Sequence, residues 1–199
     1  MSILLIVVSV AYASLLEYLL HKLVMHRPFG ALEYPFKAHA LTHHRIFRAD
    51  STYHLQNEKD KWTIPMAWWN GPVLISILAI LPAIMSLALH DWRIFVIATL
   101  TGAGYYGTYE YIHWCMHLPQ KKKRMIERLP VIGWIFYRLN GHHLLHHLYM
   151  NKNFNVVLPL WDLCFGSLLV RSKIRFAQAR GPCVPDVQPK TPTQAIEEL

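Results

Sequence analysis

The chain has 199 residues, of which 53% are hydrophobic, and it carries 20 Lys and Arg against 12 Asp and Glu. This composition excludes a disordered chain, and three cysteines without a Cys-x-x-Cys pair exclude a disulfide-rich scaffold and a thiol redox motif. The net charge of +8 indicates an anionic partner, either nucleic acid or a phospholipid surface, and the apolar content favours the membrane.

Three apolar stretches predict transmembrane helices, at residues 2–25, 65–89 and 94–116, in an all-α integral membrane protein. The first lacks a basic residue ahead of its apolar run and stays apolar beyond its one weak cleavage-like site, so it predicts a retained helix rather than a signal peptide. The second lies in an uncharged run, in which Pro72 and Pro82 are expected to kink the helix. A short polar turn around Trp92 then predicts a hairpin of the second and third spans.

The basic residues predict the orientation in the membrane. They lie in residues 22–61 and 121–190, and Arg93 is the one exception among the 20. The positive-inside rule therefore places the His-rich regions, residues 26–64 and 117–179, in the cytosol, under a bacterial inner membrane or the endoplasmic reticulum. The basic run 121–124 indicates topology and contact with anionic headgroups, and nucleic acid is excluded as a partner.

The remaining sequence predicts one membrane domain, residues 1–179, and a flexible Pro-rich tail, residues 180–199. Two shorter apolar stretches, 131–139 and 156–170, predict helices at the membrane interface or packed in the core. The motif Gly102-Ala103-Gly104-Tyr105-Tyr106-Gly107 has the letters of a dinucleotide fingerprint, but it lies within a span, without a preceding strand. Small residues there indicate close approach of a neighbouring helix.

Eleven of the 13 histidines fall into four clusters, each at or near an inner end of a span. Side chains four residues apart share a helix face, and the spaced pairs that satisfy this rule are His39 and His43, His113 and His117, and His143 and His147. Adjacent histidines point about 100° apart, which suits two metals on either side of a helix. His21 and His26 do not fit an α-helix, but Pro28 ends the helix and lets His26 turn back. The pattern predicts a polynuclear metal site, with His54 and His90 as bystanders.

Two carboxylates accompany these clusters. Glu17 lies one turn before His21, and Glu110 lies three residues before His113. Each is expected either to accept an imidazole N–H or bind the metal, or to be a buried carboxylate paired with Lys or His, and both readings stay open. Residues further considered for contact with the ligands are His142, Asn155 and Asp162, the last because a charge in an apolar stretch argues against lipid exposure.

The ordered clusters His-x4-His, His-x3-His-His, His-x3-His and His-x2-His-His resemble the fatty acid hydroxylase/sterol desaturase superfamily of membrane di-iron oxygenases. The segment 153–167, with its Trp161-Asp162 and Phe165-Gly166 pairs, adds to the resemblance, which covers about residues 15–170. The ligands that it implies are His21, His26, His39, His43, His44, His113, His117, His143, His146 and His147, with His142 as a stand-in for His143.

The resemblance also implies a bundle of transmembrane helices with a cytosolic helical cap that holds two iron ions, or zinc in a purified form. Members of the superfamily commonly have four spans; three are predicted here, and a fourth would precede residue 1. The implied activity is O2-dependent hydroxylation of an unactivated C–H in a lipid-like substrate, such as a fatty acyl chain or a sterol. Electrons are expected from a ferredoxin or cytochrome b5 type of donor with its reductase, because the chain has no flavin, haem or iron–sulfur motif.

Three alternatives remain open from the sequence. A lipid desaturase and a carotenoid hydroxylase of the same superfamily would use the same histidines. A membrane metal transporter would instead place polar ligands near the middle of the membrane, whereas these histidines lie at the inner ends of the spans.

Overall fold

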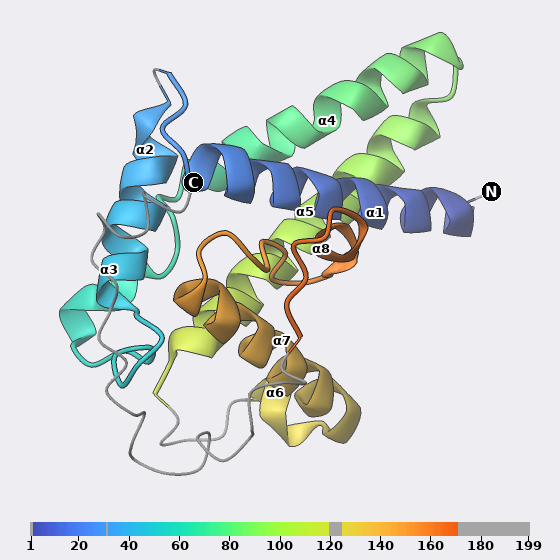
Figure 1. Ribbon diagram of the computed structural model, residues 1–199. Helices are drawn as coiled ribbons and strands as arrows, with labels where there is room; N and C mark the ends of the chain where they lie inside the picture. The colour runs from blue at the N-terminus through green and yellow to red at the C-terminus, as the bar shows by residue number, and fades with distance from the viewer. Residues whose placement is uncertain (1, 31, 120–124, 171–199) are drawn as a thin grey trace.

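The computed structural model describes residues 2–30, 32–119 and 125–170, and these ranges contain helices but no strand (Figure 1). The elements in chain order are α1 (Ser2–Leu20), η1 (His21–Met25), α2 (Glu33–Phe36), η2 (Lys37–His43), α3 (His44–Ile46), η3 (Glu58–Thr63), α4 (Asn70–Ala88), α5 (Trp92–His117), α6 (Met125–Arg128), α7 (Pro130–Leu148) and α8 (Leu160–Cys164). Two of the short elements, η1 and η2, are π-helical, and η3 is a 3-10 helix.

Of the four described helices with 19 or more residues, α1, α4 and α5 form the frame of the molecule and α7 lies beside the end of α5. Helices α4 and α5 form an antiparallel hairpin, and α1 crosses α5 (Figure 1). The hairpin packs closely because Gly102 lies under Leu78, where an added Cβ would be 2.4 Å from the Leu78 Cδ2 atom. The Gly-x-Gly-x-x-Gly motif is thus inside α5, and its first glycine serves helix packing, as its place in the sequence predicts.

Among the described residues, two helices are long and apolar enough to cross a membrane, α1 together with η1 (Ser2–Met25) and α4 (Asn70–Ala88). The second apolar stretch begins its helix at Asn70 rather than residue 65, because residues 64–69 form bends and turns. Pro72 therefore lies in the first turn, where a missing backbone N–H leaves no hydrogen bond unmade, and only Pro82 is inside the helix. Helix α5 is 26 residues long but carries Glu110 and two histidines in its C-terminal part.

The C-terminal half departs from the sequence expectation. The expected helix 131–139 is the first part of α7, which continues to Leu148 and carries the fourth histidine cluster. The expected helix 156–170 is wrong, because only Leu160–Cys164 is helical. Asn153 and Gly166 have φ angles of 57° and 70°, which interrupt regular structure on both sides of α8. The basic run 121–124 and the expected tail lie outside the described residues.

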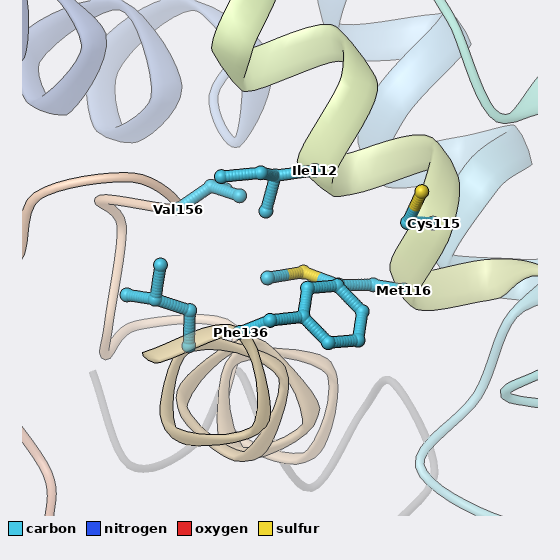
Figure 2. Packing of buried hydrophobic residues seen from close by; sticks show 6 residues of the cluster. Ile112, Cys115, Met116, Phe136 and Val156 are labelled. Atoms are coloured by element: carbon cyan, nitrogen blue, oxygen red, sulfur yellow. The ribbon is translucent and has the colours of Figure 1, made fainter. Parts of the chain in front are cut away.

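Two apolar clusters hold these parts together. The larger joins α5, α7 and the loop before α8, where Met116 faces Phe136 and Ile112 faces Val156 (Figure 2). The smaller consists of Phe47, Leu55 and Ile64, and Ile46 and Trp114 pack against it. Each cluster includes or contacts residues of α5 that are neighbours of His113 and His117 in the sequence. The apolar packing therefore fixes the end of α5 on which these two histidines lie.

Candidate metal centre

The structure brings the ten predicted ligand histidines together into two groups of five, and in each group the ligand nitrogens lie within 4.8 Å of one another. We call them group A and group B. Group A consists of His21, His26, His39, His44 and His146, and group B of His43, His113, His117, His143 and His147. All are buried except His26, which is half-buried.

The π-helical turns explain how the first two clusters reach group A. In η1 the backbone N–H of His26 donates to the carbonyl of His21 over 3.1 Å, and at the end of η2 the N–H of His44 donates to the carbonyl of His39. Such an i to i+5 hydrogen bond stacks residue i+5 over residue i, as an α-helix stacks residue i+4. The His-x4-His spacing is therefore matched to η1.

This geometry corrects the expectation that His39 and His43 share one face. His39 is grouped with His44, and His43 belongs to group B, because η2 is wound with five-residue spacing. The other two spaced pairs lie on regular α-helices, and both partners of each pair fall in group B.

Adjacent histidines divide between the groups. His44 and His146 belong to group A, whereas His43 and His147 belong to group B. The rings of His44 and His147 have their centroids 4.2 Å apart, so the two groups adjoin. The α-helix α7 and the π-helix η2 thus each supply ligand nitrogens to both groups.

Backbone carbonyls fix the tautomer of five rings. In group A, the Nδ1 atom of His21 lies 2.5 Å from the carbonyl oxygen of Phe154, and that of His146 lies 2.7 Å from the carbonyl oxygen of Lys152. A carbonyl oxygen only accepts, so each Nδ1 carries the proton and donates it. Each Nε2 then keeps a lone pair that is directed into the group.

Group B is held in the same way by a different segment. The Nδ1 atoms of three of its five rings donate to carbonyl oxygens between residues 47 and 63. The pairs are His147 with Phe47 at 2.5 Å, His117 with Tyr53 at 2.8 Å and His43 with Thr63 at 3.2 Å. The segment from the end of α3 to the end of η3 therefore orients three rings of group B.

The inward nitrogens fit a cation. In group B, the Nε2 atom of His143 faces those of His117 and His147 at 3.2 and 3.0 Å, and both of these carry lone pairs. A single proton on His143 would not satisfy both acceptors, and the Nε2 atoms of His43 and His113 are buried without a hydrogen-bond partner. A bound metal ion would satisfy all of these lone pairs, so the residues fit a metal in each group.

The histidines are also in the protonation state that a metal requires. Burial lowers the pKa of His43 to about 3, and burial together with neighbouring histidines lowers the pKa of His39, His44 and His146 well below the ordinary value. Neutral imidazoles are metal ligands for iron, zinc, copper and nickel alike. The buried histidine groups can therefore bind metal ions, but the ligands do not choose among these metals.

The remaining candidates lie around the two groups. The carboxylate of Glu17 accepts hydrogen bonds from the Tyr105 hydroxyl at 2.5 Å, the Asn155 side-chain amide at 3.1 Å and the Val156 backbone N–H at 2.6 Å. Glu110 accepts from the Tyr106 hydroxyl at 2.8 Å. In all of these hydrogen bonds the glutamate carboxylates accept from hydroxyl and amide groups, and none of these donors is an imidazole.

Asp162 is buried and lies 3.5 Å from the Nε2 atom of His142. Burial by itself would raise the pKa of Asp162, but the neighbouring His142 and the hydrogen bonds from the Asn155 and Phe154 backbone and from Ser167 hold the pKa below its ordinary value. His143 is in group B and His142 is outside both groups. His54 and His90 are also outside them, and His90 lies in the turn between α4 and α5 with a φ of 51°.

An apolar cavity reaches group A from the side of the long helices. It lies between α1, α4 and α5 and measures about 650 Å³, its open mouth included. Its walls include Leu16, Leu74 and Leu78, and His21 lines one part of it. Glu17, Asn70 and three tyrosines of α5 are its polar lining groups. Sequence reasoning missed Tyr105 and Tyr106 because a tyrosine in an apolar helix is ordinary.

Comparisons of the chain with protein-family models, curated proteins and solved structures find no match. The histidine-rich cluster and two apolar helices are compatible with a histidine-box membrane protein. The likeness to a superfamily is thus a resemblance in the sequence motifs alone, and no comparison shows the family.

Proposed function

We propose that the chain is an O2-dependent di-iron hydroxylase that acts on an unactivated C–H of a lipid-like substrate. The observation that carries the proposal is the pair of adjoining five-histidine groups, one of which lines an apolar cavity. An octahedral ion takes about six ligands, so five imidazoles leave about one position open for a small molecule such as O2.

When bound, the two iron ions would activate O2 and supply the oxidant for the C–H bond. The protein's own part is to gather ten imidazoles, five of them held by their outer nitrogens, and to offer a cavity lined mainly by apolar side chains. A chain that enters this cavity meets group A at His21. The electrons come from a separate donor, and the basic cytosolic face fits an acidic protein, so turnover should fall as salt is raised.

We further propose that α1, α4 and α5 all span a membrane, with the histidine groups on the cytosolic side. Helix α4 has 19 residues, or about 28 Å, close to the thickness of a bilayer core. Exposed tryptophans lie near its two ends, with Trp68 86% and Trp92 69% exposed. Tryptophan favours the two membrane–water interfaces, which supports a membrane slab between these two side chains.

The test is metal analysis of the purified full-length protein, together with mass spectrometry of lipids and carotenoids from expressing cells. We expect about two metal ions per chain and a product heavier by about 16 mass units, the mass of the added oxygen. The variants His43→Ala and His146→Ala should abolish the product, whereas His90→Ala, outside both groups, should keep it. Less than about one metal per chain would exclude the dimetal proposal, and a product lighter by about two mass units would indicate desaturation.

A further inference from the structure

The segment 154–156 presents three consecutive backbone N–H groups to two carboxylates. The N–H groups of Phe154 and Asn155 donate to the two oxygens of Asp162 over 2.9 and 2.7 Å. The next N–H, of Val156, donates to Glu17 over 2.6 Å. The two acids come from opposite ends of the chain, so the segment is clamped between α1 and α8.

Other groups hold each carboxylate in place. The Ser167 hydroxyl donates to Asp162 over 2.7 Å, and the side chain of Asp162 has an exposed fraction of 0%. The Tyr105 hydroxyl of α5 and the side-chain amide of Asn155 donate to Glu17. Hydrogen bonds to charged groups are stronger than those between neutral groups, and a buried carboxylate left without them is costly, so the clamp is rigid.

The clamped segment is also the one that orients group A. The carbonyl of Phe154 accepts from His21, and the carbonyl of Lys152, two residues earlier, accepts from His146. Group B takes its three carbonyl partners from residues 47, 53 and 63, which lie between the end of α3 and the end of η3. The backbone segment that the two carboxylates hold thus contacts group A, whereas the imidazole next to Asp162, that of His142, is outside both groups.

We propose that Glu17 and Asp162 are positioning residues, which clamp segment 154–156 and so keep group A, but not group B, in the geometry that binds metal. This inference rests on the proposed function insofar as the groups bind metal. Glu17 also lines the apolar cavity. One residue of the clamp, Glu17, thus lines the cavity, and the segment that it helps to hold orients His21.

The test is a titration of the metal-free full-length protein with Co²⁺. Binding is monitored by the visible absorption of the bound Co²⁺, in the wild type and in Asp162→Asn. An asparagine has nearly the shape of aspartate but accepts with only one oxygen. We expect one of two Co²⁺ sites to weaken by roughly 10–100-fold, as the loss of outer partners of metal-bound histidines does, and the other to keep its affinity. The variant Glu17→Gln should weaken the same site, and Glu110→Gln, which alters a carboxylate outside the clamp, should weaken neither.

Two further variants, each with one histidine group disabled, show which group forms the weakened site. With group B disabled by His117→Ala, Asp162→Asn should weaken the one remaining site, whereas with group A disabled by His26→Ala it should have no effect. Equal weakening in both backgrounds, or wild-type affinity in all variants, would overturn the proposal. If Asp162→Asn does not fold, Ser167→Ala removes only one hydrogen bond to the same carboxylate and gives the same contrast on a smaller scale.

A wild type that binds two Co²⁺ ions alongside an unaffected Asp162→Asn overturns the clamp alone. A wild type that binds less than one ion overturns the dimetal function as well. The two failures are therefore distinguishable.

Discussion

Groups A and B contain the same number of histidines but have different surroundings. Group A includes the half-buried His26, and its His21 lines the apolar cavity, whereas all five members of group B are buried. The two share the ligand-bearing segments η2 and α7 but take their carbonyl partners from different loops. Shared helices fix the spacing between two sites, and separate loops allow each to be oriented on its own.

The largest expected effect comes from replacing, one at a time, the two adjacent histidines His146 and His147 on α7. His146→Ala removes a ligand from group A, and His147→Ala removes one from group B. Each should lower turnover by more than about 100-fold, because loss of a ligand exceeds the effect of losing an outer partner. Metal analysis should find about one ion fewer in each variant. Loss of both ions from either variant would show that the two groups are one cooperative site.

Both groups consist of neutral imidazoles, so the stability of the folded chain should fall in acid. Burial lowers the pKa of His43 from 6.5 to about 3 in the folded chain. As the pH falls below 6.5, the unfolded chain takes up a proton that the folded chain does not, so stability is lost down to about pH 3.

Each such histidine costs about 1.4 kcal/mol of unfolding free energy per pH unit. Thermal unfolding of the metal-free protein in detergent, from pH 8 to pH 5, should show this slope, and His43→Gln should reduce it by one histidine's share. An unchanged slope in the variant would contradict the burial of a neutral His43.

A smaller effect tests whether the cavity serves group A. Leu74→Trp places a large ring in the cavity wall on α4 and should lower turnover by about tenfold while both metals stay bound. Leu87→Trp, on the same helix but outside the cavity lining and 77% exposed, is the matched control. Equal turnover in the two variants would show that the substrate does not use this cavity.

The sequence could predict the helical class and the histidines that meet, because both depend on local pattern. Apolar runs of bilayer length appear as α1 and α4, and the spacing of His113 with His117 places both on one face of α5. The apolar stretch 156–170 misled, because only Leu160–Cys164 is helical and the buried Asp162 binds the backbone of the preceding loop. Its hydrogen bonds to the backbone hold a loop that composition does not reveal.

The sequence by itself determined the four histidine clusters and that adjacent histidines diverge, since residue identity and the helical repeat are properties of the chain. The resemblance implied the ten ligands and left His142 open beside His143, and the structure decided for His143. Only the tertiary structure decided that His39 pairs with His44, that the ten divide into two fives, and that two loops hold the outer nitrogens. The physical reason is that a π-turn and a carbonyl acceptor are backbone features. Every residue has a carbonyl, and only packing determines which one faces an imidazole.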